Sequence, residues 1–412
     1  MYDWPIYECL VIACLVISLP GVLSQLSTKS LYENPITACV VGLWFAVVFS
    51  HLATWEAWTS GVMFAKVVIY YLLLVANVNS EARIKTFLRW LLVLIALLAA
   101  IALLTAHHII QLPDVRVLLE SQYDRTTGRM VVITRLQATG IFHDPNDLAM
   151  ILVTGAAVAI CFAANPALGM RRILLLPLVG LFGYAIYRTQ SRGGLLALMA
   201  ALASLLHARW GWKRTALAAA VALPLLLAAS KGRMMSYADA MDSKEGTAQA
   251  RLQLWSDGLQ LLKQQPVFGI GEGNYGKNAG QVAHNSFLHA FTELGFFGGP
   301  LFLGAFLAGF MMLYRLRGEE ALAENSELAR LLPYVTAMLV GFAVSMFSLS
   351  QNYTVPTYMM LGLVTAYIQV AGGWTQVFPL RFDAWFLKRL AFGSACFLAA
   401  MYVFVRVAVR WS

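Results

Sequence analysis

The amino-acid sequence predicts an all-α protein, a bundle of helices that crosses a lipid bilayer many times. Of the 412 residues, 59% are hydrophobic and only 12% are charged, and the mean hydropathy is +0.68. A soluble domain usually carries about a quarter charged residues. This chain therefore has too few charges to cover a surface that faces water, and a bilayer is the solvent that fits its composition.

Apolar segments supply the helices of this bundle. A bilayer core is about 30 Å thick, so a spanning helix needs about 20 mostly apolar residues. Twelve segments approach that length, and they lie near 6–24, 36–54, 61–78, 86–106, 147–164, 171–188, 193–208, 214–230, 294–314, 331–350, 357–373 and 389–408. We expect one polytopic membrane domain over residues 1–412, with about twelve spanning helices.

Basic residues in three short loops set the expected orientation. They are Arg83, Lys85 and Arg89, then Arg171 and Arg172, then Arg209, Lys213 and Arg214. Positive charge in short loops marks the cytoplasmic side, and counting crossings puts all three loops there. The long segments 107–146 and 231–283 then lie on the other side. Twelve crossings would also put both termini there, unless the first segment is re-entrant or the last does not cross.

Charge and cysteine usage exclude several kinds of protein. The net charge is +9, but the cations lie in short loops between apolar runs, which indicates topology and attraction to anionic lipid or phosphate-bearing substrates rather than nucleic acid. All five cysteines fall inside apolar runs without a CxxC partner, so no zinc site or disulfide framework is expected. The first apolar run opens with Asp3 and Glu8 instead of a basic region, which favours a retained helix over a cleaved signal.

Two polar turns on the predicted non-cytoplasmic side stand out. In the stretch 142–148, Asn146 and Asp147 lie where a helix enters the membrane, and they fit a helix cap, a substrate contact or both. In the stretch 187–194, two arginines lie close to the membrane surface. For Arg188, a candidate substrate-binding residue, an interfacial snorkelling role is favoured. Arg192 is followed by two glycines that allow close backbone approach, so phosphate binding is favoured there.

A third polar stretch forms an amphipathic helix. Leucine and tryptophan recur at three and four residues within 248–265, which predicts a helix along the membrane surface that stops before Pro266. Arg251 lies off the centre of its apolar stripe. The glycines of 269–275 look like a phosphate loop, but they follow no strand of a βαβ unit, so a dinucleotide site is not expected. They predict a tight turn beside a ligand, next to Tyr275.

The last polar stretch contains His284, which directly precedes an apolar helix and is followed by Asn285. Most of the seven histidines fit a packed or interfacial imidazole, but His284 has a polar, glycine-flanked setting. His289 lies about 140° further round a helix. The two are therefore a poor pair of metal ligands, and without an HExxH motif or carboxylate cluster no catalytic metal is expected.

These residues together resemble the O-antigen ligase and polymerase superfamily of bacterial envelope glycosyltransferases. The superfamily's ligase pattern is His followed by Asn, Ser or Gln, then nine residues, then Gly-x-x-Gly. His284 and Asn285, the nine residues 286–294, and Gly295 to Gly298 fit it without a gap. The Ser191-Arg-Gly-Gly turn and the Ala250-Arg251 pair look like the superfamily's two essential arginine positions, and the stretch 145–149 is also similar.

The resemblance implies a GT-C-like bundle in the bacterial inner membrane, with an active site formed by the periplasmic segments 107–146 and 231–293. It implies an inverting, metal-independent ligase that needs no cofactor and moves a glycan from undecaprenyl diphosphate to a sugar hydroxyl of lipid A core. His284 is then the general base. Arg192 and Arg251 stabilise the diphosphate, and Asn285 and Tyr275 orient acceptor or phosphate.

Two alternatives stay open at this point. One is a polymerase of the same superfamily that joins repeat units of O-antigen or exopolysaccharide. The other is a transporter of lipid-linked glycans, whose polar residues would lie near the bilayer midplane. The polar stretches of this chain gather at one predicted membrane face, which favours an enzyme. The chain departs from the superfamily in one respect. Ligases usually have both termini in the cytoplasm, whereas twelve crossings would put both termini of this chain on the other side of the membrane.

Overall fold

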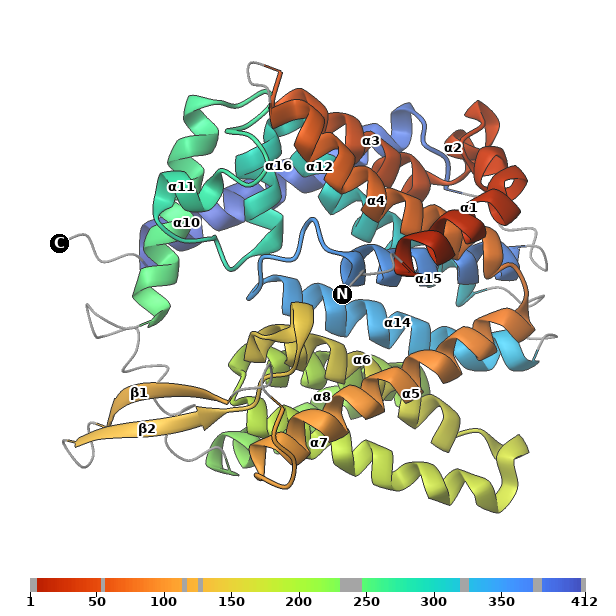
Figure 1. The fold of residues 1–412 in the computed structure, drawn as a ribbon, viewed down its shortest axis with the longest axis vertical. Helices are drawn as coiled ribbons and strands as arrows, with labels where there is room; N and C mark the ends of the chain where they lie inside the picture. The colour runs from red at the N-terminus through yellow and green to blue at the C-terminus, as the bar shows by residue number, and fades with distance from the viewer. Residues whose placement is uncertain are drawn as a thin grey trace. The chain divides into compact units, whose positions relative to one another are not determined.

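A computed structural model describes residues 6–52, 56–112, 117–124, 129–229, 247–318, 326–372 and 380–408 (Figure 1). Within these residues the chain is predominantly α-helical, which confirms the predicted all-α polytopic bundle. Parts of the two predicted periplasmic segments, namely 113–116, 125–128 and 231–246, lie outside the described residues.

Ten helical stretches of the described chain are long and apolar enough to cross a membrane. They lie within α1 (Ile6–Gln25), α4 (Glu56–Asn77), α5 (Glu81–Ala106), α6 (Pro145–Ala163), η2 with α7 (Pro166–Thr189), α8 (Arg192–Ala229), α12 (Ser286–Leu316), α14 (Ser326–Met346), α15 (Val355–Gly372) and α16 (Ala384–Ala408). Helix α3 (Pro35–Ser50) is apolar but shorter. The predicted pair 193–208 and 214–230 corresponds to two helices within α8 that meet at a break at Gly211, where φ is 74°. Because α8 is counted as one stretch, the pair accounts for part of the difference from about twelve.

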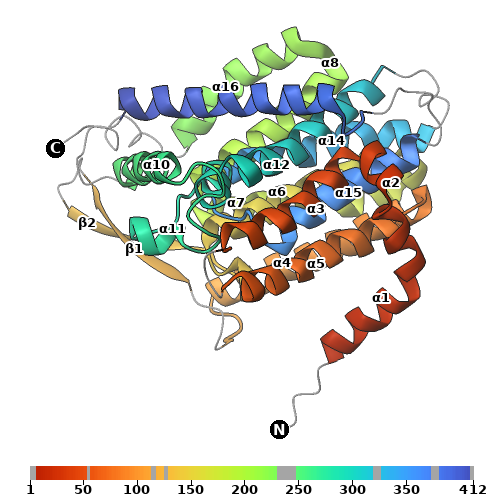
Figure 2. The ribbon, with the colours of Figure 1, turned by 90° about the horizontal axis from the view of Figure 1, so that it is seen from above.

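The described chain forms two compact units, and the first comprises residues 1–86, 254–329 and 350–407. In this unit α12 packs against α3, and α4 packs against both α3 and α15 (Figure 2). The buried Tyr71 hydroxyl lies 2.9 Å from the hydroxyl of Thr37 and 3.0 Å from that of Thr365, so one hydrogen-bonded cluster joins α3, α4 and α15. The unit also contains α2 (Thr28–Glu33) and α11 (Tyr275–Ala279).

The second unit comprises residues 87–253, 330–349 and 408–412, and α6 lies at its centre. Small residues let the helices approach one another closely. A Cβ atom added to Gly155 of α6 would lie 2.8 Å from Ile95 and 3.1 Å from Phe182. Such close contacts are typical of helix packing in membranes, where van der Waals contact replaces the hydrophobic effect.

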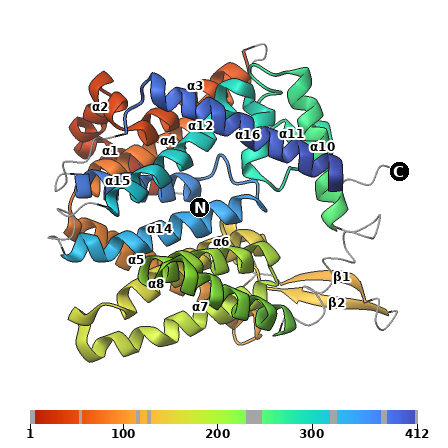
Figure 3. The same cartoon turned by 180° about the vertical axis from the view of Figure 1, so that it is seen from behind.

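An antiparallel hairpin in the second unit was not predicted from the sequence. Strand β1 (Leu118–Asp124) pairs with β2 (Arg129–Arg135), with Leu118 opposite Arg135 (Figure 3). The signal in the sequence is the β-branched run of residues 131–134, because such side chains favour strands. The run is short, and the polar residues around it made the whole segment 107–146 look like a loop.

The predicted amphipathic helix 248–265 is confirmed as α10 (Thr247–Gln264). Of the predicted apolar stripe, Leu252 and Leu262 are buried and Trp255 and Leu259 are half-buried. The helix ends two residues before Pro266, whose ring and missing N–H cannot continue a helix.

Candidate active site

His284 lies at the entrance to α12, in the first unit. Asn285 is the N-cap of this helix, and its Oδ1 atom accepts a hydrogen bond from the Leu288 N–H at 3.2 Å. His284 itself is half-buried and has φ 49°, a left-handed conformation that non-glycine residues rarely adopt. Its N–H donates to the Ser350 Oγ atom at 3.0 Å. The helix cap and this bond together hold the backbone of His284 at the entrance to α12.

The first glycine of the Gly-x-x-Gly pattern is the point where α12 breaks. Gly295 has φ 61° and ψ −159°, which only glycine adopts without strain. A Cβ atom there would lie 2.6 Å from both the Pro266 oxygen and the Gly269 nitrogen. The loop after α10 therefore docks into the break, where the Phe296 N–H donates to the Pro266 oxygen at 2.7 Å.

The second glycine, Gly298, allows α12 and α3 to touch. A Cβ atom added there would lie 2.8 Å from the Cβ of Ala46 on α3. The nine residues between Asn285 and Gly295 thus form a short helix with a cap at one end and a docked loop at the other. These contacts give a structural reason for the spacing of the motif.

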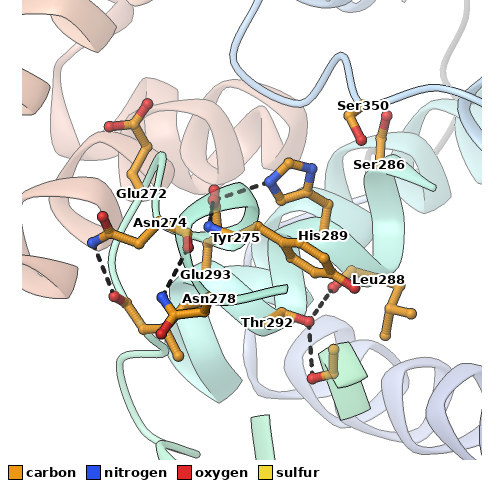
Figure 4. A network of polar contacts seen from close by, with 12 residues as sticks. Glu272, Asn274, Tyr275, Asn278, Ser286, Leu288, His289, Thr292, Glu293 and Ser350 are labelled. Carbon is orange, nitrogen blue, oxygen red and sulfur yellow. Dashed lines mark hydrogen bonds and ion pairs between the residues drawn. The ribbon is translucent and has the colours of Figure 1, made fainter. Parts of the chain in front are cut away.

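The glycine-rich loop 269–275 already holds an anion, the carboxylate of Glu293 (Figure 4). The Tyr275 N–H donates to Glu293 Oε1 at 2.8 Å, and the Gly273 N–H also donates to this carboxylate. The Gly271 N–H donates to the Glu293 backbone oxygen at 3.1 Å. An internal carboxylate thus takes N–H donors of the kind that bind a phosphate in a phosphate loop.

Glu293 is fully buried, and His289 is its partner one helical turn earlier. His289 Nε2 lies 3.0 Å from Glu293 Oε1, and Figure 4 shows the imidazole directed at the carboxylate. Tyr353 lies nearby, and burial together with the Glu293 and Glu272 carboxylates raises the pKa of its phenol. Burial also raises the pKa of Glu272, whose backbone oxygen lies 3.0 Å from the buried His51 Nε2.

Sequence patterns did not reveal this cluster of the buried Glu293 and His51 with the half-buried Tyr353 and Glu272. In the sequence, His289 was considered only as a second metal ligand beside His284, and the two were judged a poor pair. The available signal was the His-x-x-x-Glu spacing of residues 289 and 293, which places the two side chains on one face of a helix. No group of three or more metal-ligating side chains occurs among the described residues.

Tyr275 and Asn285, both predicted to orient substrate, have internal partners in this structure. The Tyr275 side chain is fully buried, and its hydroxyl donates to the Leu254 backbone oxygen at 2.6 Å. Burial raises the pKa of this phenol. Asn285 is likewise buried in its capping role. Their contact with substrate stays a prediction.

Arg192 is the first residue of α8, in the second unit, and it is half-buried. The turn before it is held by Ser191, whose Oγ accepts the Gly194 N–H at 3.0 Å and donates to Asn146 Oδ1 at 2.7 Å. Gly194 is tightly packed, because an added Cβ would collide with Ala149 of α6. The turn that carries Arg192 is therefore anchored on the start of α6.

A buried arginine that sequence patterns did not reveal, Arg135, completes this anchor. It lies at the end of β2 and donates to the Thr189 backbone oxygen and to Asn146 Oδ1, each at 3.1 Å. It also forms an ion pair with Glu120 at 3.1 Å. Asn146 is thus held by two side chains, while Asp144 caps α6 by accepting the Asn146 N–H at 2.7 Å.

The two remaining predicted residues also lie in the second unit. Arg188 is half-buried, and its Nη1 atom donates to the Tyr184 hydroxyl at 3.0 Å and lies 3.4 Å from His107 Nε2. This agrees with the interfacial role favoured for it. Arg251 is half-buried on α10.

A comparison with protein families finds a match in the central part of the chain. Residues 177–303 match a family model described as O-antigen ligase. The matched segment is less than a third of the chain, and it includes Arg192, Arg251, His284 and both glycines of the Gly-x-x-Gly pattern. The predicted resemblance to the O-antigen ligase and polymerase superfamily is confirmed. A comparison with curated proteins found no match.

Proposed function

From the O-antigen ligase family segment at residues 177–303, we propose that this multi-pass membrane chain is an O-antigen ligase. The proposed reaction moves a glycan from undecaprenyl diphosphate to a sugar hydroxyl of lipid A core, on the periplasmic side of the inner membrane. The observation that carries the proposal is the placement of His284, capped and hydrogen-bonded at the entrance to α12, at the motif's spacing from Gly295.

His284 acts in this proposal as the general base. A sugar hydroxyl is a weak nucleophile, and histidine titrates near the working pH, so the neutral imidazole can accept the hydroxyl proton as attack proceeds. The acceptor oxygen forms a bond to the anomeric carbon while the bond from that carbon to the diphosphate oxygen breaks. The electron pair of the broken bond leaves with the diphosphate, and the anomeric configuration inverts.

Arginines supply the positive charge for the leaving diphosphate. Their planar guanidinium groups suit bidentate contact with phosphate, and charge stabilisation of this kind is worth most where negative charge grows in the transition state. We assign this role to Arg192 and Arg251. The start of α8 adds to it, since N–H groups at a helix N-terminus favour an anion. Arg135 and Asn146 support the turn that carries Arg192.

Purified protein tests the catalytic assignment directly. Transfer from a defined lipid-linked donor to core lipid is measured with EDTA present, for the wild type, for His284→Ala and for His207→Ala. His207 is an exposed control on α8, outside both segments predicted to form the active site. Loss of a general base costs about 10²–10⁴-fold in rate. Near-normal transfer by His284→Ala would remove the base from the mechanism.

Deletion of the gene separates the ligase from its alternatives. Core lipid without attached polymer, together with accumulation of carrier-linked polymer, supports a ligase. Loss of long chains with single repeats still attached to core indicates a polymerase of the same superfamily. A transporter would show no chemical transfer with purified components.

A further inference from the structure

The backbone of His284 needs an external restraint. Its φ of 49° is one of three positive values at non-glycine residues in the described part of the chain. A side chain with a Cβ atom is disfavoured in this region, so an isolated peptide would relax to an extended or right-handed conformation. Residues held in such conformations persist only where their surroundings over-determine them.

Two hydrogen bonds on either side of Asn285 supply that restraint. The His284 N–H donates to Ser350 Oγ at 3.0 Å, and the Gln351 N–H donates to Ser286 Oγ at 2.9 Å. Figure 4 shows the Ser350 and Ser286 side chains beside each other. The two bonds run in opposite directions between the entrance of α12 and the segment before α15, so each segment both donates and accepts.

The segment that carries Ser350 is itself held firmly. The Gln351 oxygen accepts the Thr357 hydroxyl at 2.6 Å, and the Asn352 oxygen accepts the Tyr358 hydroxyl at 2.9 Å. These bonds tie residues 351 and 352 to the first turn of α15. The backbone next to Ser350 is therefore held in place by α15. Ser350 lies outside the segment 177–303 that matches the family model.

We propose that Ser350 is a positioning residue for the proposed reaction, one that holds His284 in its left-handed conformation so that the imidazole meets the acceptor hydroxyl. The proposal rests on the proposed role of His284 as the general base. Ser350 takes no proton and touches no reacting atom. Without its oxygen, the His284 N–H loses its acceptor and the peptide can rotate, which moves the ring away from a productive geometry. Small misplacements of a catalytic group lower the rate of reaction more than the binding of substrate.

The test compares Ser350→Ala with a matched control, Ser394→Ala, which removes a buried hydroxyl from α16 in the same unit. We expect Ser350→Ala to lower kcat about tenfold, the factor that corresponds to one neutral hydrogen bond, with KM for donor and acceptor nearly unchanged. Ser350→Thr retains the oxygen and should restore most of the rate, whereas the similarly shaped Ser350→Val should not. If Ser350→Ala does not fold, the difference in rate between Ser350→Thr and Ser350→Val tests the positioning role instead.

A double-mutant cycle separates positioning from general stability. If Ser350 acts through His284, adding Ser350→Ala to His284→Ala should leave the residual rate unchanged, because effects of residues that work as a unit are not additive. An equal loss in both backgrounds, or equal rates for the Thr and Val variants, would overturn the proposal. Normal transfer by His284→Ala would instead contradict the proposed function, so the two failures are distinguishable.

Discussion

Replacing Gly295 by alanine should destabilise the first unit strongly. The backbone conformation of Gly295 is one that side-chain-bearing residues adopt at a cost of about 1–3 kcal/mol. The new methyl group would also collide with backbone atoms of Pro266 and Gly269, which cannot turn aside as a flexible side chain can. Overpacking of this kind costs about 1–3 kcal/mol more. The expected loss in free energy of unfolding is therefore about 2–6 kcal/mol.

Thermal unfolding of the detergent-solubilised protein measures this loss. Aliquots are heated, and the fraction that stays monodisperse on size-exclusion chromatography gives a melting temperature. The matched control is Gly276→Ala, in α11, where an added Cβ atom has no neighbour closer than 4.0 Å. Its melting temperature should stay the same or rise, since alanine is favoured over glycine in a helix. Equal melting temperatures for Gly295→Ala and the wild type would refute the idea that the motif needs glycine at this break.

Three further predictions concern polar groups that are buried or half-buried. Glu293→Ala removes the acceptor of both the Tyr275 N–H and His289, and leaving each buried group without a partner costs about 1–3 kcal/mol. The melting temperature of this variant should therefore lie well below that of Glu272→Ala. Equal melting temperatures for the two variants would contradict the role of Glu293 as an internal anion. Burial raises the pKa of Glu272 above the ordinary value of 4.5, so the folded state holds this proton more tightly than the unfolded chain. Stability should consequently fall as pH rises through the window between the two values, and melting curves of Glu272→Gln should lack this fall. Arg135→Ala should raise the KM for the lipid-linked glycan donor, and Arg135→Lys should not restore it, because the Nε and Nη2 atoms of the arginine bind different partners. Restoration of the KM by lysine would show that charge alone suffices at this position.

The parts of the fold that sequence patterns predicted are those in which each helix buries a continuous apolar face. Composition alone indicated a membrane bundle, and the stripe of Leu252, Trp255, Leu259 and Leu262 marked α10 to within a residue at each end. The count of spanning helices was less accurate. Twelve segments were expected, whereas ten helical stretches of the described residues are long and apolar enough, because α3 has only 16 residues and because the two helices that meet at Gly211 count as one stretch.

The parts of the site that the sequence did not reveal depend on contacts between distant segments. Glu293 looked like an ordinary residue in the spacer of the motif, yet its carboxylate accepts the N–H of Tyr275, 18 residues earlier, and so organises the glycine-rich loop. Arg135 looked like one of several loop cations, and only the hairpin brings it to Asn146 and Thr189. A lone charged residue has no periodicity, so no local pattern distinguishes a buried one from a solvated one.

The motif from His284 to Gly298 forms one continuous structural element, in which the contacts at its two ends depend on each other. The nine residues 286–294 span about two and a half turns of helix. His284 and its cap stand at one end, and the break at Gly295 receives the loop after α10 at the other. One residue more or less would turn His284 by about 100° relative to that break and separate its N–H from Ser350. If His284 is the general base, as we propose, the spacing of the motif matters as much as the histidine itself, because the spacing sets the direction in which the histidine stands.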